Sequence, residues 1–292
     1  MTSPHPAMTR ILEVIERLSE QPYRTSFVLT GEPGTGKDGL ARALAHLTCP
    51  GGPIVRYDVV GFPEEEALDH LCGVGRRAGV AEAADGGTIL IEELAGLGPR
   101  TQAALLRLLK SGRCERRGGG PLALPALADD VADATRADSK ADSKSESKSD
   151  SKTRRLDVRV IAMSDRDLAA EVAAGRLRHD LYYRLGRIAL WLPPLRERIE
   201  DLAPATIWMG NRVLGAAGLP FELLDVEQYR RATPAERARA IALDPGAVRA
   251  LEQHTWPGNF RELEAVLERA LLLYRTGQVL RAEEIRSALA MP

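Results

Sequence analysis

Apolar residues in the first two thirds of the chain fall into short continuous runs separated by stretches with helical spacing. The runs lie at residues 26–30, 54–58, 88–93, 157–163 and 188–192. Short apolar runs bounded by turn residues are typical of strands buried on both faces. Apolar positions three and four apart predict helices over 64–71 and 99–110, and one around Ile11 and Ile15. This alternation predicts an α/β fold with a five-stranded parallel sheet flanked by helices.

From residue 194 onward the pattern is helical. Thr233 and Glu236 make a capping box, with Pro234 at the first helical position. Asn259 and Glu262 have the spacing of another capping pair. We therefore expect two domains, an α/β domain over residues 1–193 and a small all-helical domain over residues 194–292.

Residues 118–155 differ in composition from the rest of the chain. They contain near-copies of one polar triplet, Asp138-Ser139-Lys140, and few apolar side chains. Such a segment cannot bury enough apolar surface to fold, so it predicts a disordered, low-complexity insert. Its alternating charges favour a solubilising role over a binding site.

Composition narrows the class of protein. The 292 residues are 44% hydrophobic and carry a net charge of −1, which supports a packed core and provides no basic field for nucleic acid. Cys49, Cys72 and Cys114 are widely spaced, so neither a zinc motif nor a disulfide framework is expected, and a reducing cytoplasm fits. No apolar run approaches the roughly 18 residues of a membrane span, so no membrane association is expected.

One loop between the first strand and a helical repeat carries a chemical signature. It reads Gly31-Glu32-Pro33-Gly34-Thr35-Gly36-Lys37-Asp38. Glycines let backbone N–H groups approach phosphate oxygens, the helix that follows adds its positive end, and Lys37 adds a cation. An ordinary glycine-rich turn is the alternative. The Ser or Thr that usually follows the lysine as a Mg²⁺ ligand is replaced by Asp38.

Two carboxylates, Glu92 and Glu93, end the third strand. The phosphate loop and the end of this strand meet at the same edge of a parallel sheet, so we expect both carboxylates to lie close to the loop. In nucleotide hydrolysis one carboxylate supports Mg²⁺, usually through water, and the next polarises the attacking water. We assign the metal side to Glu92, with Asp38, and the water to Glu93. A helix cap or a surface pair is the alternative.

Several ordered blocks carry a resemblance to a known family. The blocks are residues 31–38, 84–88, 157–161, 166–168, 180–185, 192–198 and 256–263. Together they resemble the AAA+ ATPase domain of the bacterial enhancer-binding proteins, which activate RNA polymerase carrying sigma-54. The resemblance covers nearly the whole chain. It implies ATP and Mg²⁺ as cofactors and a homo-oligomeric ring, a hexamer or a heptamer.

The resemblance also implies roles for individual residues. Arg178 and Arg184 would be arginine fingers that reach the ATP of a neighbouring subunit, and Arg261 would be the second sensor, on the lid. A guanidinium suits the charge on a transferring phosphoryl group. Without the surrounding blocks, each arginine would read as part of a surface salt bridge.

The chain departs from the family at defined places. Glu92 stands where the family has Asp, and Asp165 where its first sensor is Asn. The sigma-54-contacting loop, Gly-Ala-Phe-Thr-Gly-Ala in the family, is reduced to residues 70–77 without an aromatic. The insert 118–155 lies in the second pore-facing loop.

Two functions remain open. The first is an oligomeric ATPase of the sigma-54-interaction type that remodels a protein partner and regulates transcription. The second is a degenerate nucleotide-binding regulatory subunit with weak or no hydrolysis and no direct sigma-54 activation. The family implies sigma-54 polymerase as the partner, but the shortened loop speaks against it. No helix-turn-helix follows the lid, so no DNA-binding domain is expected.

Overall fold

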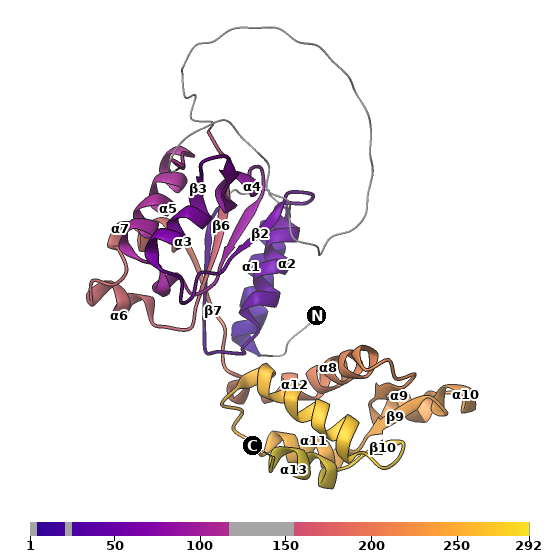
Figure 1. The fold of residues 1–292 in the computed structure, drawn as a ribbon. Helices are drawn as coiled ribbons and strands as arrows, with labels where there is room; N and C mark the ends of the chain where they lie inside the picture. The colour runs from indigo at the N-terminus through magenta and orange to yellow at the C-terminus, as the bar shows by residue number, and fades with distance from the viewer. Residues whose placement is uncertain (1–4, 21–24, 117–154, 292) are drawn as a thin grey trace, which may run out of the picture.

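A five-stranded parallel sheet organises the first part of the molecule (Figure 1). The computed structural model describes residues 5–20, 25–116 and 155–291. The strands are β1 (Phe27–Thr30), β2 (Ile54–Tyr57), β5 (Thr88–Ile91), β6 (Arg159–Ser164) and β7 (Ile188–Trp191), in the spatial order β2-β5-β6-β1-β7. All neighbours in this sheet pair in parallel, which confirms the predicted fold class. Apart from residue 155, the predicted disordered insert lies outside the described residues.

Helices cover both faces of this sheet (Figure 1). One face carries α1 (Pro6–Glu20) and α2 (Lys37–Thr48). The other carries α3 (Glu64–Cys72), α5 (Pro99–Ser111) and α7 (His179–Leu185). Shorter elements in this part are α4 (Val80–Ala83), a 3₁₀ turn (Leu94–Gly96) and α6 (Leu168–Ala173).

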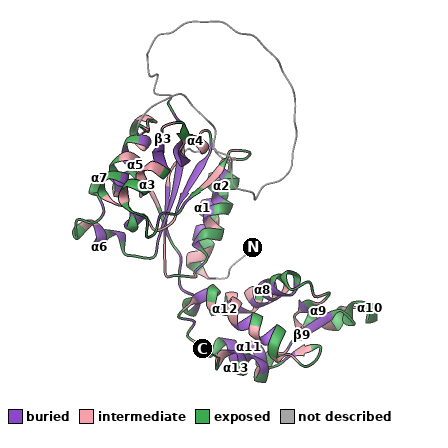
Figure 2. Ribbon diagram, viewed as in Figure 1, coloured by how far each residue is buried: buried purple, intermediate pink, exposed green. Residues whose placement is uncertain are grey.

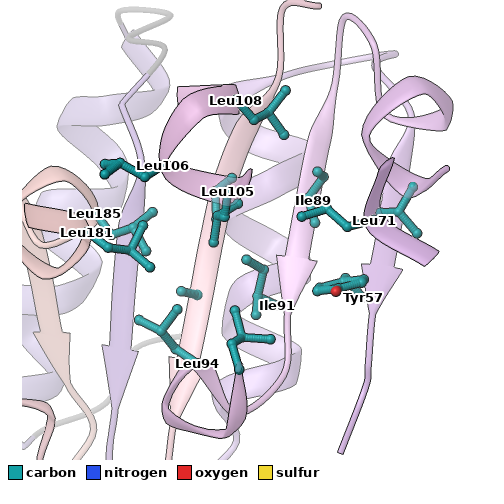
Figure 3. Packing of buried hydrophobic residues seen from close by; sticks show 14 of the residues in the cluster. Tyr57, Leu71, Ile89, Ile91, Leu94, Leu105, Leu106, Leu108, Leu181 and Leu185 are labelled. Carbon is teal, nitrogen blue, oxygen red and sulfur yellow. The ribbon is translucent and has the colours of Figure 1, made fainter. Parts of the chain in front are cut away.

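Each face of the sheet has its own core. Toward α3, α5 and α7, Ile89 and Ile91 pack against Leu105 and Leu181 (Figure 3). Toward α1 and α2, the side chains of Leu90 and Ile161 pack among Ile11, Leu44 and their neighbours. The strands are therefore buried on both sides, whereas the outward faces of the helices are exposed (Figure 2). This arrangement leaves the carboxyl ends of the strands as the place where polar groups meet.

A two-stranded hairpin, β3 (Gly73–Val74) and β4 (Arg77–Ala78), follows α3. At its base Cys72 forms a disulfide with Cys114, with their Cα atoms 5.3 Å apart, and Cys49 is free. The prediction that the cysteines form no disulfide is therefore wrong. The two positions are 42 residues apart in the sequence, and they meet because α3 packs on α5. Sequence spacing alone could not show this.

The second part of the molecule contains helices and a small sheet. Its helical elements are 3₁₀ turns at Leu195–Glu197 and Ile199–Asp201, α8 (Leu202–Ala216), α9 (Val226–Arg231), α10 (Pro234–Arg237), α11 (Pro245–Glu252), α12 (Asn259–Arg269), a π-helical turn (Ala270–Tyr274) and α13 (Ala282–Leu289). Three short parallel strands, β8 (Glu222–Leu224), β9 (Ala240–Leu243) and β10 (Val279–Leu280), pair in the order β10-β9-β8. The prediction of an all-helical domain is therefore wrong, because these short apolar segments pair with each other across long separations.

The core of this second part draws on residues from Leu195 onward, with Trp256 as its largest fully buried side chain. The capping box of Thr233 and Glu236 is present at the start of α10, as predicted. Among the described residues, no helix is both long enough and apolar enough to cross a membrane.

Candidate functional site

The glycine-rich loop joins β1 to α2 and turns its backbone around the lysine at the start of the helix. Gly34 and Gly36 have φ values of 77° and 97°, a region that favours glycine. The ammonium group of Lys37 donates to the carbonyl oxygens of Gly31 and Glu32, both at 2.8 Å. Lys37 is only 8% exposed, and its ammonium group also forms an ion pair with Asp165. The lysine is therefore held inside the loop, with its charge balanced by the end of β6.

Glu93 lies in the same cluster. Its backbone is left-handed, with φ 52°, which turns the side chain toward β6. The carboxylate accepts hydrogen bonds from Ser164 Oγ at 2.8 Å and from the backbone N–H of Asp165 at 3.1 Å. The structure thus brings together Lys37, Asp165 and Glu93 at this edge of the sheet.

The two carboxylates predicted for Mg²⁺ are both paired with arginines. Glu92 forms an ion pair with Arg56 of β2, and the Oδ2 of Asp38 accepts from the Nε of Arg42 at 3.1 Å. The hydrogen bond that Arg56 donates to Glu92 raises the pKa of Arg56, more than burial lowers it. In the part of the chain that the structure describes, no group of three or more His, Cys, Asp or Glu side chains could hold a metal ion. Asp38 and Glu92 are thus each paired with a guanidinium group and do not form a ligand cluster with each other.

Asn259 connects the second part of the molecule to the phosphate loop. It is fully buried, with φ 52°. Its amide donates to Pro33 O at 3.0 Å, and its carbonyl oxygen accepts from the backbone N–H of Leu195 at 2.7 Å. The prediction that Asn259 and Glu262 cap α12 is wrong, because Gly258 is the N-cap residue and Glu262 accepts from the Gly258 N–H at 2.8 Å. The asparagine side chain is used for a tertiary contact instead.

Three neighbours of Asn259 reinforce this contact. The backbone N–H of Phe260 donates to Gly34 O at 2.9 Å, and the guanidinium of Arg198 donates to Thr35 O at 2.7 Å. Arg198 is 3% exposed and lies 4.7 Å from the centre of the Phe260 ring, and burial lowers its pKa. A Cβ on Gly34 would overlap the carbonyl oxygen of Gly258, so only glycine allows this approach.

Glu32 forms the outer contact between the loop and the second part. Its two carboxylate oxygens pair with the guanidinium of Arg196, one of them at 2.7 Å. The Arg196 hydrogen bond is the largest cause that lowers the pKa of Glu32, from 4.5 to about 2. Sequence reasoning recognised the blocks that hold Arg196, Arg198 and Phe260, but assigned these residues no function. The sequence signal that could have identified these three residues was their position within the blocks shared with the family.

The three arginines assigned from the resemblance lie in different places. Arg261 is exposed. A Cβ atom built on Gly34 would lie 3.3 Å from the Cβ atom of Arg261, so the side chain of Arg261 leaves the backbone beside the loop. Arg178 precedes α7 and pairs with Asp180 at 3.0 Å, while Arg184 donates to Leu109 O at 3.0 Å. Helix α7 lies across the sheet from α2 (Figure 1). Within the described chain, neither Arg178 nor Arg184 contacts the phosphate loop.

Comparison with known proteins agrees with these features. Residues 1–124 and 141–191 match the Sigma-54 interaction domain, and residues 222–291 match the AAA+ ATPase lid domain. The Nif-specific regulatory protein of Azotobacter vinelandii is 32% identical over 287 residues, covering 94% of this chain and 45% of the relative. The anaerobic nitric oxide reductase transcription regulator NorR of Salmonella paratyphi C is 34% identical over 281 residues, 92% of this chain and 45% of the relative. The chain therefore spans about half the length of these relatives.

Solved structures agree with the fold. NtrX from Brucella abortus, crystallised in complex with ADP, superposes with a TM-score of 0.71 at 25% identity, covering 97% of this chain and 54% of that chain. A RuvB mutant from Thermotoga maritima, at 12% identity and a TM-score of 0.52, shares the fold alone.

Proposed function

Because the chain belongs to the Sigma-54 interaction domain family, we propose that it binds ATP between its phosphate loop and its lid. The observation that carries this proposal is the contact between them. Asn259 and Phe260 hold the carbonyls of Pro33 and Gly34, so the lid is attached to the loop that would cradle the phosphates. The ADP complex of the related NtrX supports a nucleotide as the ligand. The expected boundary between α/β domain and lid, near residues 193–194, is part of the proposal.

The active form in this proposal is a cytoplasmic homo-oligomeric ring, a hexamer or a heptamer. Arg184 lies in α7 and Arg178 immediately precedes it, and α7 is on the opposite face of the sheet from α2 (Figure 1). Their contacts with Asp180 and Leu109 leave them away from the loop of their own chain, which is consistent with a role at a neighbouring subunit. Arg261 starts beside Gly34, which suits a sensor on the same chain's lid. Hydrolysis would then occur between subunits, with Glu93 orienting the attacking water.

A second candidate is the regulatory subunit with weak hydrolysis. One observation favours it: Asp165 forms an ion pair with Lys37, the cation that we expect to bind the outer phosphates. Nucleotide binding must break this pair or place phosphate beside it. For both candidate functions we assign no residue to the Mg²⁺ expected with ATP, because Asp38 is paired with Arg42 and Glu92 with Arg56.

The partner in this proposal is a protein other than sigma-54 polymerase. In the family, an aromatic at the tip of a loop contacts sigma-54. Here the corresponding segment is the short hairpin β3–β4, whose turn is Gly75-Arg76. Its base is fixed by the disulfide of Cys72, and Arg116 donates to Gly75 O at 3.4 Å while pairing with Glu82. Such a hairpin has neither the reach nor the aromatic of the family loop.

ATPase activity measured across protein concentration separates the two candidates. For the oligomeric ATPase, specific activity rises as subunits assemble. Arg178→Ala or Arg184→Ala then lowers turnover by about 10³-fold or more with ATP affinity unchanged, because arginine fingers act on the transition state. Arg187→Ala, an exposed arginine next to the same helix, is the matched control. ATP binding without turnover at any concentration identifies the regulatory subunit, and constant specific activity in a monomer contradicts the ring.

A further inference from the structure

Three successive residues of the phosphate loop, Pro33, Gly34 and Thr35, each have their carbonyl oxygen bonded by a donor from beyond residue 194. The donors are the side-chain amide of Asn259, the backbone N–H of Phe260 and the guanidinium of Arg198, at 3.0, 2.9 and 2.7 Å respectively. The second part of the molecule therefore holds every peptide unit of the loop from Pro33 to Gly36.

A bond to a carbonyl oxygen also fixes the N–H group of the following residue. A peptide unit is planar and trans, so its C=O and its N–H point in opposite directions. The three bonds therefore direct the N–H groups of Gly34, Thr35 and Gly36 away from their donors. The Thr35 N–H donates to Glu32 O at 3.4 Å, whereas the N–H groups of Gly34 and Gly36 make no bond to the backbone of the described residues. These two N–H groups are available to a ligand.

Gly36 depends most on such support. Its φ is 97°, and glycine adopts positive and negative φ about equally well, so the peptide unit between Thr35 and Gly36 has little conformational preference of its own. Turns that contain left-handed residues can gather successive N–H groups into an anion-binding concavity. The bond from Arg198 to Thr35 O holds the peptide unit that carries the Gly36 N–H, directly before Lys37.

Arg198 is placed for this contact with the loop. It is 3% exposed, and its guanidinium carbon lies 4.7 Å from the centre of the Phe260 ring. Among the described residues its side chain donates only to Thr35 O, and its Nε has no hydrogen-bond partner. Water therefore cannot easily replace the bond, and the ring of Phe260 keeps the guanidinium plane in position.

We propose that Arg198 is a positioning residue for phosphate binding: its bond to Thr35 O holds the Gly36 N–H toward the inside of the loop, where a phosphate oxygen of the nucleotide accepts it. Arg198 itself does not touch the nucleotide. An N–H that donates to a phosphate makes a charge-assisted hydrogen bond, and a loop already held in the binding conformation loses less freedom when the ligand arrives. The inference rests on the proposed function and names the residue that prepares the loop for the phosphates.

The amide proton of Gly36, followed by NMR on the full chain during an ATP titration, tests this role. In the unmodified chain its signal should move downfield, because the N–H donates to a phosphate. Arg198→Gln should reduce that shift at saturating ATP and raise the dissociation constant of ATP by about tenfold or more, the scale of one hydrogen bond to a charged group. Arg198→Lys keeps a charged donor but not the planar group beside the Phe260 ring, so both of its values should fall between these two.

Arg159→Gln is the matched control, because it also removes a buried guanidinium. Arg159 is 5% exposed and donates to the hydroxyls of Thr48 and Thr88. Arg159 and Thr88 begin the parallel strands β6 and β5, whereas the phosphate loop follows the end of β1, so Arg159 lies at the opposite end of the sheet. Its replacement should lower stability and leave both the Gly36 shift and the ATP affinity unchanged.

The outcomes separate this inference from the proposed function. Absence of ATP binding by the unmodified chain overturns both. ATP binding that leaves the Gly36 amide proton in place overturns the inference and keeps the proposed function. Binding by Arg198→Gln within about threefold of the unmodified chain, or a full Gly36 shift despite weaker binding, also overturns the inference. If Arg198→Gln does not fold, Arg198→Lys decides, and an affinity and a Gly36 shift equal to those of the unmodified chain contradict the role of Arg198.

Discussion

Individual side chains at the phosphate loop already have partners within the chain. Lys37 is paired with Asp165, Glu93 accepts from Ser164 and Asp165, and Glu92 is paired with Arg56. A nucleotide therefore exchanges existing partners instead of meeting free charges. The affinity for ATP will reflect the difference between the two sets of contacts, because breaking an internal ion pair offsets part of what the phosphates gain.

The pair of Glu32 and Arg196 predicts a pH dependence of stability. The folded pKa of Glu32, about 2, lies below its ordinary value of 4.5, so the ionised form stabilises the fold. That contribution is complete above about pH 4.5 and is lost as the pH falls through about 2. The side chain of Glu32 is 39% exposed, so solvent screening limits the contribution to about 1 kcal/mol or less.

Chemical denaturation of the chain and of Glu32→Gln between pH 7 and pH 2 measures this contribution. The difference in unfolding free energy should be largest near neutral pH and should disappear toward pH 2. Glu227→Gln removes an exposed carboxylate paired with Arg231 and gives the background for such a change. A difference that grows as the pH falls would show that the sign is wrong.

Secondary-structure elements differ in how far the sequence determines them. The strands of the main sheet are continuous apolar runs, so local pattern was enough to predict them. Strand β9, Ala240–Leu243, lies in a helical context, and only its pairing with β8 and β10 makes it a strand. The disulfide of Cys72 and Cys114 likewise depends on the packing of two helices that are distant in the sequence.

The candidate site shows the same division. The phosphate loop and Glu93 were predicted because the residues that identify them are adjacent in the sequence. Arg56 and Arg196 were missed because each acts on a carboxylate far along the chain, Glu92 and Glu32 respectively. Asn259 fits a local capping pattern, but its amide is used between two parts of the molecule. The residues of the site that depend on contacts between distant parts of the sequence could not be predicted from periodicity or motifs.

Asn259 offers a prediction at the start of α12. Asn259→Ala should reduce the free energy of unfolding by about 2–4 kcal/mol, since it leaves the buried N–H of Leu195 unpaired and places alanine at a left-handed position. Denaturation with and without ATP measures both stability and attachment of the lid. Gln253→Ala, at the exposed end of α11, is the control. A loss below about 0.5 kcal/mol, the usual range of surface substitutions, would contradict the role of Asn259.

At the scale of the whole molecule, the chain is an AAA+ fold of the Sigma-54 interaction domain family with the short hairpin β3–β4 after α3. Backbone and side-chain hydrogen bonds connect its phosphate loop to its lid. We therefore expect a nucleotide that changes the conformation of the loop to move the lid as well. The hairpin β3–β4 is tied to the residues after α5 by the disulfide and by Arg116. Movement is therefore expected at the lid more than at the hairpin.

This arrangement predicts the behaviour of the chain in transcription. The isolated chain, with ATP and sigma-54 polymerase on supercoiled template, should yield no ATP-dependent transcript. A lost aromatic anchor weakens an interface by at least about 2 kcal/mol, and the short hairpin also lacks reach. An active relative under the same conditions is the positive control. A transcript that depends on ATP and on this chain alone would refute the prediction.

The central claim, that the loop from Gly31 to Asp38 binds ATP, is tested most directly by the melting temperature with and without ATP. At an ATP concentration 100 times the dissociation constant, binding stabilises the fold by about 2.7 kcal/mol, which raises the melting temperature by several degrees. Lys37→Ala should melt cooperatively and show no such rise, while Lys110→Ala, at an exposed position of α5, should respond like the unmodified chain. An equal rise in Lys37→Ala, or no rise in the unmodified chain, would contradict the account.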